Sequence, residues 1–225
     1  MENITFDMST MHMFGSAYFD YLALRKRFFV DTLGWHIPHN DKVEMDQYDN
    51  PTAHYSLVLR DGQVVGGART MATTATWGQH TYMLRDAFAG KLVDIPAEVM
   101  PADVANAQMW ECTRLVISDD VDTQIDRSEC LSLIVGGLID VAARNGATRL
   151  MSLSPISLMR ALRQLGFDAE RIGEPYLNEG DGRRYAVLSM SATAAQPRQH
   201  LNTFTTQPHR PRCRHKLKRH RKGGV

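Results

Sequence analysis

The 225-residue sequence lacks several features that would assign it to a large class of proteins. No stretch approaches the roughly 18 consecutive apolar residues of a membrane-spanning helix, so we expect none. The first ten residues have neither a basic segment nor an apolar core, which argues against a signal peptide. The chain also lacks the GxxxxGK[ST] and GxGxxG patterns of phosphate and dinucleotide sites. These absences predict a cytoplasmic protein with no membrane partner.

Cysteine is scarce, and its spacing suggests no special chemistry. Cys112, Cys130 and Cys213 are too far apart for a metal or redox motif, so we expect free thiols in a reducing compartment. The nine histidines show no ligand spacing either. We therefore expect no metal and no cofactor.

Charge is distributed unevenly along the chain. Residues 191–225 contain nine Lys and Arg and no acid, so the first 190 residues keep 17 of the 26 basic residues and all 25 acids, a net charge of −8. The sequence thus predicts one domain over residues 1–190 and a basic, disordered tail over 191–225. The tail has a single aromatic residue, Phe204, and so lacks the stacking residues of a nucleic-acid module. We do not expect nucleic acid as a partner.

Hydrophobic periodicity and turn residues predict alternating helices and strands in the first 190 residues. The Asp61-Gly62 pair is a strong hairpin signal, and Asn145-Gly146 is a typical helix end. The pattern predicts a mixed sheet with helices on its faces. The expected helices are 14–33, 84–88, 127–144 and one opened by Ser154-Pro155; the expected strands are 54–60, 63–73, 108–118, 148–153, 167–172 and 184–190.

Arg25 falls in the middle of the apolar stripe of the first predicted helix, whereas Arg27 falls on the opposite side. A buried guanidinium needs a carboxylate partner, and Asp46 and Asp49 follow in a segment without apolar runs. Arg69 lies on a strand beside small residues and could join them. The residues alone leave two alternatives, a structural brace or a site that binds a substrate carboxylate.

Glu111 and Arg114 lie on an otherwise apolar strand, where a carboxylate can serve as a general base or be paired and inert. Side chains three residues apart face opposite sides of a regular strand, so a shared site requires either a bulge between them or an Arg114 side chain that reaches round the end of the strand. Among the nearby aromatic residues, Phe29 suits core packing, whereas Trp35, after Gly34 at a helix end, suits a pocket floor.

Five separated segments together resemble one known family, the acyl-homoserine lactone synthases, over about residues 5–190. These segments are Arg25-x-x-x-Phe29, Trp35, Glu44–Asp49, Gly67-Ala68-Arg69 and Glu111-Cys112-Thr113-Arg114. The resemblance implies an α/β fold, a GCN5-related N-acyltransferase-like sandwich whose mixed, mostly antiparallel sheet is flanked by helices and opens a V-shaped cleft. It implies two substrates, S-adenosylmethionine and an acyl chain carried by acyl carrier protein, and release of methylthioadenosine after lactonisation.

The resemblance also implies roles for individual residues. Glu111 and Arg114 would be catalytic, and Met151 with Ser152 would line the acyl-chain pocket. In members that prefer 3-oxo chains a threonine occupies that strand, and Met151 stands there in this sequence. The side that binds S-adenosylmethionine would comprise Arg25, Phe29, Trp35, Asp46, Asp49 and Arg69.

An acidic carrier protein requires a basic surface, and Arg144, Arg149, Arg160 and Arg163 near the later helices are the predicted docking residues. The alternative function is an acyl-CoA-dependent N-acyltransferase of the same superfamily. Such enzymes bind a pyrophosphate at a glycine-rich loop after the central strand, where this chain has Ser118-Asp119-Asp120-Val121-Asp122. Three acids would repel a diphosphate, which favours the carrier protein as donor.

Overall fold

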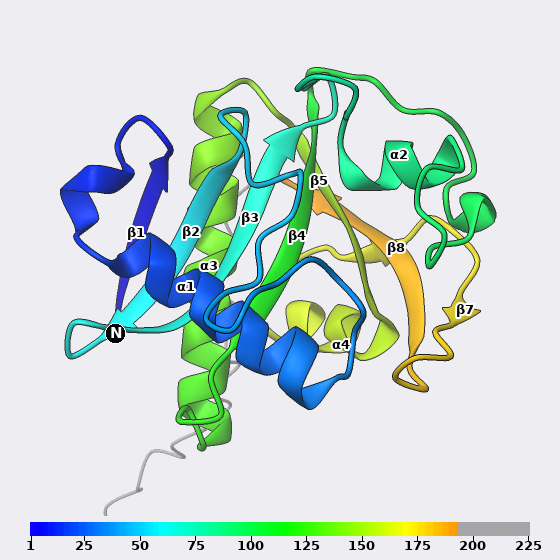
Figure 1. Ribbon diagram of the computed structural model, residues 1–225. Helices are drawn as coiled ribbons and strands as arrows, with labels where there is room; N and C mark the ends of the chain where they lie inside the picture. The colour runs from blue at the N-terminus through cyan, green and yellow to red at the C-terminus, as the bar shows by residue number, and fades with distance from the viewer. Residues whose placement is uncertain (193–225) are drawn as a thin grey trace, which may run out of the picture.

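The computed structural model describes residues 1–192, and the remainder of the predicted tail, with Cys213, lies outside the described residues. The described chain forms one sheet with helices on both faces (Figure 1). Its helices are η1 (Met11–Phe14), α1 (Ala17–Arg25), η2 (Lys26–Thr32), α2 (Met83–Phe88), η3 (Ala97–Val99), α3 (Gln124–Arg144) and α4 (Ile156–Gln164). Its strands are β1 (Glu2–Asp7), β2 (His54–Arg60), β3 (Gln63–Ala72), β4 (Met109–Ile117), β5 (Arg149–Pro155), β6 (Glu170–Arg171), β7 (Tyr176–Leu177) and β8 (Arg184–Ser191).

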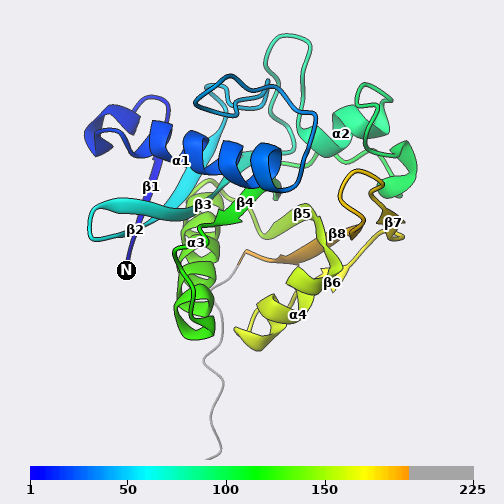
Figure 2. The same ribbon diagram turned by 60° about the horizontal axis from the view of Figure 1, so that its bottom comes forward.

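The strand order across the described sheet is β1-β2-β3-β4-β5-β8-β6, with β7 paired to β8. The pairings are antiparallel except for β4 with β5, which run parallel. Helices α1 and α2 lie on one face and α3 and α4 on the other, as Figure 2 shows. This arrangement confirms the predicted mixed, mostly antiparallel sandwich. Two apolar cores separate accordingly, one beneath α1 and one beneath α3 and α4.

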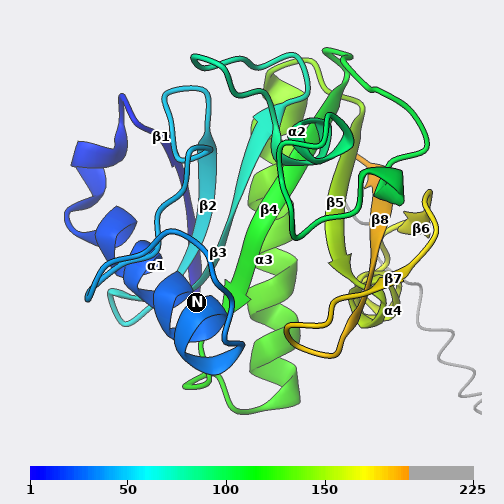
Figure 3. The same cartoon turned by 45° about the vertical axis from the view of Figure 1, so that its right-hand side comes forward.

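The parallel pair β4–β5 is the point at which the sheet opens. Its register joins Met109–Glu111 to Arg149–Met151 and extends no further along either strand. Beyond these three pairs β4 stays with β3, and β5 stays with β8, so the two strands diverge toward their carboxyl ends (Figure 3). The predicted V-shaped cleft therefore lies between β4 and β5.

The β2–β3 hairpin follows its sequence signals closely. Asp61 and Gly62 both have positive φ, 54° and 78°, as a tight two-residue turn requires. Gly66 and Gly67 lie where helices approach both faces of β3. A Cβ atom on Gly66 would stand 2.8 Å from Sγ of Cys130 on α3, and one on Gly67 would stand 3.0 Å from the Tyr21 ring on α1. The paired glycines thus allow close packing of both helices.

Several predicted elements differ from the structure. The helix expected over 14–33 begins at Ala17, because Gly15 with φ 58° separates it from the 3-10 turn η1, and after Arg25 it continues as the π-helix η2. The strand expected over 167–172 contracts to β6, and Pro155 ends β5 rather than lying within the next helix. Strands β1 and β7 were not predicted. Both are short edge segments whose strand character comes from their partners, β2 and β8.

Candidate active site

A cluster of three guanidinium groups and three carboxylates lies between α1 and the sheet. The Nε of Arg25 donates to Glu44 at 2.6 Å, and its two terminal nitrogens donate to Asp49 at 2.8 Å each. Arg25, Glu44 and Asp49 are buried. The helical-wheel prediction that Arg25 is buried with a carboxylate is therefore confirmed, with Asp49 and Glu44 as its partners.

Arg69 and Arg114 extend the cluster toward the cleft. Arg69 donates to Asp46 at 2.6 Å, to Asp49 at 2.8 Å and to the Thr113 hydroxyl at 3.1 Å. Arg114 lies 2.8 Å from Asp46 and 3.3 Å from Glu44. Each guanidinium is thus shared between two acids, and each acid between two guanidinium groups, which fixes the positions of all six side chains.

The two aspartates keep their charge through these pairs. Burial raises the pKa of Asp49, but the Arg69 and Arg25 guanidinium groups outweigh it and hold that pKa well below its ordinary value. For Asp46, Arg69 and Arg114 likewise outweigh burial and lower the pKa. Both carboxylates are therefore ionised at neutral pH.

A β-bulge brings Arg114 to the same side of the sheet as the cluster. The register between β3 and β4 shifts between Gly67 and Arg69, and Arg114 has φ 56°, a left-handed conformation that is uncommon outside glycine. The Tyr21 hydroxyl donates to the Arg114 carbonyl at 2.7 Å, which anchors the bulge to α1. A bulge that allows Glu111 and Arg114 to serve one site is thus present.

Glu111 has backbone partners rather than a cation. Its two carboxylate oxygens accept from the N–H groups of Met83 and Leu84, at 2.9 Å each, in the first turn of α2. Burial raises the pKa of Glu111 to about 7, although these two hydrogen bonds lower it in part. A carboxylate with this pKa exchanges protons near neutral pH. Its position also fastens α2 to β4.

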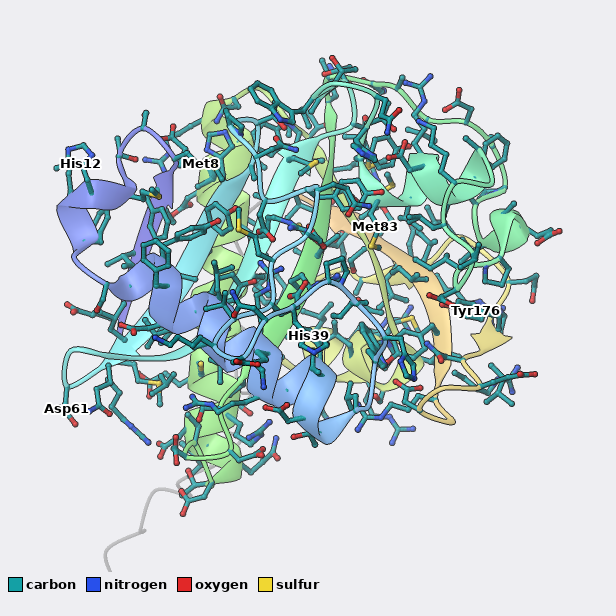
Figure 4. The ribbon with its side chains drawn as sticks, viewed as in Figure 1. Met8, His12, His39, Asp61, Met83 and Tyr176 are labelled. Atoms are coloured by element: carbon teal, nitrogen blue, oxygen red, sulfur yellow. The ribbon has the colours of Figure 1, made fainter. Side chains whose placement is uncertain are left out.

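A cavity of about 1110 Å³ occupies the opening between β4 and β5. Phe29 and Trp35 line one part of it together with Asp46 and Arg114, which belong to the charged cluster. The Met83 and Tyr176 side chains, labelled in Figure 4, line it from α2 and β7. The cavity continues between the strands to apolar residues on the far face of the sheet, including Val135, Leu138, Leu158, Ala161 and Leu162 of α3 and α4.

The sequence-predicted substrate residues divide into two groups. Phe29, Trp35, Asp46 and Arg114 line the cavity directly, as do Met151 and Ser152. Arg25, Asp49, Arg69 and Glu111 are not among the described lining residues and are at most 5% exposed. The cluster is therefore a buried brace whose outer pair, Asp46 and Arg114, faces the cavity, and its binding of a substrate carboxylate stays a prediction.

The predicted docking arginines are not all brought together. Arg160 and Arg163 are exposed on α4, and Arg149 lies nearby on β5, where it pairs with Glu170. Arg163 donates to the Ala169 carbonyl at 2.7 Å. Arg144, at the end of α3, instead bonds Thr5 of β1, on the opposite half of the sheet. A single surface therefore includes at most Arg149, Arg160 and Arg163.

Sequence reasoning missed several residues of the site. Glu44 is buried and joins Arg25 to Arg114, and its place two residues before Asp46 in the acidic segment was an available signal. Tyr48 lines the cavity, and its ring lies 5.7 Å from the Arg69 guanidinium. Asp181 bonds Trp35 from 146 residues away, a contact that no local pattern could indicate.

No residues that could group around a metal ion occur in the part of the chain that the structure describes. Over residues 1–192, no helix combines the length and apolar character needed to cross a membrane.

The mixed sheet, the opening between β4 and β5 and the cavity through it define an acyltransferase fold. An acyl-CoA N-acyltransferase from Pseudomonas aeruginosa shares this fold, with a TM-score of 0.53 and 16% identity over 84% of this chain and 99% of that one. A sequence model of the autoinducer synthases matches residues 10–198. The chain belongs to this family and is an acyltransferase of the acyl-homoserine-lactone synthase type.

Individual relatives agree with this assignment. An acyl-homoserine-lactone synthase of Acinetobacter nosocomialis is 32% identical over 171 residues, which cover 72% of this chain and 86% of the relative. The solved structure of TofI in a ternary complex with an inhibitor and MTA is 25% identical, with a TM-score of 0.67 over 87% of this chain and 94% of TofI. The CoA-dependent acyl-homoserine lactone synthase BjaI, solved with MTA, has the same fold, with a TM-score of 0.68, 19% identity and coverage of 84% of this chain and 82% of BjaI.

Proposed function

We propose that the enzyme joins S-adenosylmethionine to an acyl chain delivered by acyl carrier protein and closes the product to a lactone. The observation that carries this proposal is the two-sided cavity, charged and aromatic at Asp46, Arg114 and Trp35 and apolar beyond Met151. Arg114 suits a carboxylate of the amino-acid part, and Phe29 and Trp35 suit the sulfonium or adenine. The apolar part suits the acyl chain, whose burial is favourable by about 0.8 kcal/mol per CH₂. S-adenosylmethionine is a substrate here, and the reaction needs no cofactor.

The chemistry takes two steps. The amine of S-adenosylmethionine, once deprotonated, attacks the thioester carbonyl, and an amide forms as the carrier thiol leaves. The methionyl carboxylate then displaces methylthioadenosine from its own γ-carbon and closes the ring. The sulfonium is already a good leaving group, so positioning by the cavity suffices for closure.

Glu111 is the proposed base for the first step. Its pKa of about 7 suits proton transfer at neutral pH. Because it is 1% exposed and lies outside the cavity lining, the proton reaches it through a water molecule rather than directly. The bulge takes Arg114 and Leu115 out of the paired register of β4, and their N–H groups are the proposed oxyanion donors.

The segment after β4 supports a carrier protein over coenzyme A as the donor. The N–H of Asp120 is already bonded to the Ser118 hydroxyl at 3.2 Å, and the Thr123 side chain caps α3 by accepting from the N–H of Asp126 at 3.0 Å. These donors are thus satisfied within the protein, and acids surround them. A diphosphate would meet like charge instead of free N–H groups.

The test is a comparison of donors. Purified full-length protein is incubated with S-adenosylmethionine and either an acyl carrier protein thioester or the matching acyl-CoA, and mass spectrometry follows the lactone and methylthioadenosine. We expect equal amounts of both products and a higher kcat/KM with the carrier thioester. Preference for acyl-CoA would overturn the donor proposal, and acylated product without methylthioadenosine would instead identify a simple N-acyltransferase.

A further inference from the structure

A side-chain bridge spans the open side of the cleft. The indole N–H of Trp35 donates to Oδ2 of Asp181 at 3.1 Å, and the Tyr185 hydroxyl donates to the same oxygen at 2.7 Å. The other carboxylate oxygen accepts from the N–H of Arg183 at 3.0 Å, which fixes Asp181 within its own turn. Trp35 follows η2, whereas Asp181 lies in the turn between β7 and β8. The two segments lie side by side in Figures 2 and 3.

The bridge connects the two halves that the sheet allows to separate. Strands β4 and β5 pair only at Met109–Glu111 with Arg149–Met151, at the closed end of the V. The Trp35–Asp181 bond links the β4 half to the β8 half beyond that point, where the cavity opens. It therefore opposes further separation of the two halves.

The bridge also determines where the Trp35 ring lies. The ring stacks on Phe29 with centroids 5.0 Å apart and lies 6.1 Å from the Tyr185 ring. Gly34, with φ 69°, turns the chain out of η2 just before it and imposes no side chain of its own. Trp35 thus leaves a helix end, and its indole N–H is fixed by an acid from the opposite half.

We propose that Asp181 is a positioning residue that holds Trp35 on the cavity wall by bridging the cleft, and so controls affinity for the sulfonium substrate. The proposal rests on the proposed function, because it takes Trp35 as part of the S-adenosylmethionine side. The two side-chain donors of the bridge, Trp35 and Tyr185, are neutral, so the bridge requires an acceptor oxygen rather than a negative charge. A neutral side chain with an acceptor oxygen should therefore preserve a positioning role, whereas it would abolish a role that depends on the negative charge.

Substitution at Asp181 tests the role of the acceptor. We expect Asp181→Ala to raise the KM for S-adenosylmethionine about tenfold with a smaller change in kcat, since it removes the acceptor of the Trp35 and Tyr185 hydrogen bonds together with that of the Arg183 N–H. Asp181→Asn keeps one acceptor oxygen for Trp35 and Tyr185 and gives up only the bond from the Arg183 N–H, so its KM should stay within about threefold of wild type. The control is Glu174→Ala, an exposed acid between β6 and β7, with no expected change. An unchanged KM in Asp181→Ala, or equal effects of Ala and Asn, would overturn the proposal.

A double-mutant cycle shows whether Asp181 acts through Trp35. Trp35→Phe keeps a ring and removes the N–H, so the double variant with Asp181→Ala should be no worse than the more impaired single variant. Fully additive effects would contradict the bridge. If Asp181→Ala fails to fold, Tyr185→Phe removes one donor alone, and a smaller rise in KM is expected.

Acrylamide quenching of tryptophan fluorescence tests the bridge without turnover. Asp181→Ala should increase quenching relative to wild type, and this increase should vanish when Trp35→Phe is also present. Unchanged quenching would overturn the bridge. Failure to form lactone with either donor would instead count against the proposed function, so the two failures remain distinguishable.

Discussion

The two sides of the cleft are built from different interactions. On the β4 side, Arg25, Arg69 and three acids are buried, Arg114 is half-buried at the cavity, and these six side chains pair with one another. On the β5 side, the wall consists of side chains such as Met151, Leu162 and Leu188, which pack by contact alone. Removal of one member of a buried ion pair leaves an uncompensated charge and is strongly destabilising, whereas apolar walls accept side chains of different size at a smaller cost. We therefore expect the charged side to determine whether the site forms, and the apolar side to determine which chain fits.

Removal of one arginine from the cluster should have the largest effect on stability. Arg69→Met would leave Asp46 and Asp49 each with one guanidinium fewer, so we expect the free energy of unfolding to fall by about 3–5 kcal/mol. Urea denaturation followed by circular dichroism measures this. The control is Arg27→Met on the exposed side of η2, expected within about 0.5 kcal/mol of wild type. A comparably small effect at Arg69 would show that the cluster is not an intolerant brace.

Glu111→Gln should lower turnover on the order of 100-fold while S-adenosylmethionine still binds. In wild type, kcat should fall as pH drops through about 7, because Glu111 then becomes protonated and cannot accept a proton. Glu111→Gln should lack this pH dependence. Steady-state kinetics over pH 5.5–8.5 and calorimetric binding measure both, with Glu98→Gln on η3 as an exposed control. Unchanged turnover would remove Glu111 as the base.

The stability of Glu111→Gln provides a second measurement. Glutamine has one carbonyl oxygen, so it can accept from only one of the two N–H groups of α2. Because folding raises the pKa of Glu111 from 4.5 to about 7, protonated Glu111 favours the folded state, and this contribution is lost as pH rises through about 7. Loss of S-adenosylmethionine binding together with stability would indicate that Glu111 mainly anchors α2.

Met151→Ala should have a smaller effect on stability and a distinct effect on substrate choice. Its side chain already borders open space, so we expect destabilisation near the lower limit of about 2 kcal/mol for such truncations. The enlarged cavity should shift kcat/KM toward longer acyl chains, and Met151→Phe should shift it toward shorter ones. A series of acyl thioesters of increasing length measures the shift. The same preference in all three proteins would show that the wall at Met151 does not contact the chain.

Charge reversal on α4 should have the smallest effect. Arg160→Glu with Arg163→Glu should raise the KM for the carrier thioester about fivefold at low salt and less at high salt, because exposed charges are screened. Arg144→Glu is a matched control on the other half of the sheet, with no expected change. The measurement is the KM for the carrier thioester in wild type and both variants at a low and a high ionic strength. An equal rise in KM for Arg144→Glu would indicate that the carrier responds to the overall charge of the enzyme and not to a docking surface on α4.

Much of the fold could be predicted because its signals are local. The hairpin over 54–72 follows from alternation and the Asp-Gly turn, and the end of α3 follows from Asn145-Gly146. The burial of Arg25 follows from its place on one helix face. Strand β1 escaped prediction because a short edge segment gains its structure from its partner β2, which begins only at His54.

The sequence by itself determined the family, the order of the main helices and strands, and the candidate residues of the site, because these depend on residue types and short spacings. The tertiary structure alone decided which of those residues face the cavity. Burial placed Arg25, Asp49 and Arg69 behind the wall, and the bulge at Arg114 turned that side chain into it. It also decided that Glu111 bonds α2 and that Asp181 meets Trp35. These partners lie far apart in the sequence, so only the folded chain brings them within hydrogen-bond distance.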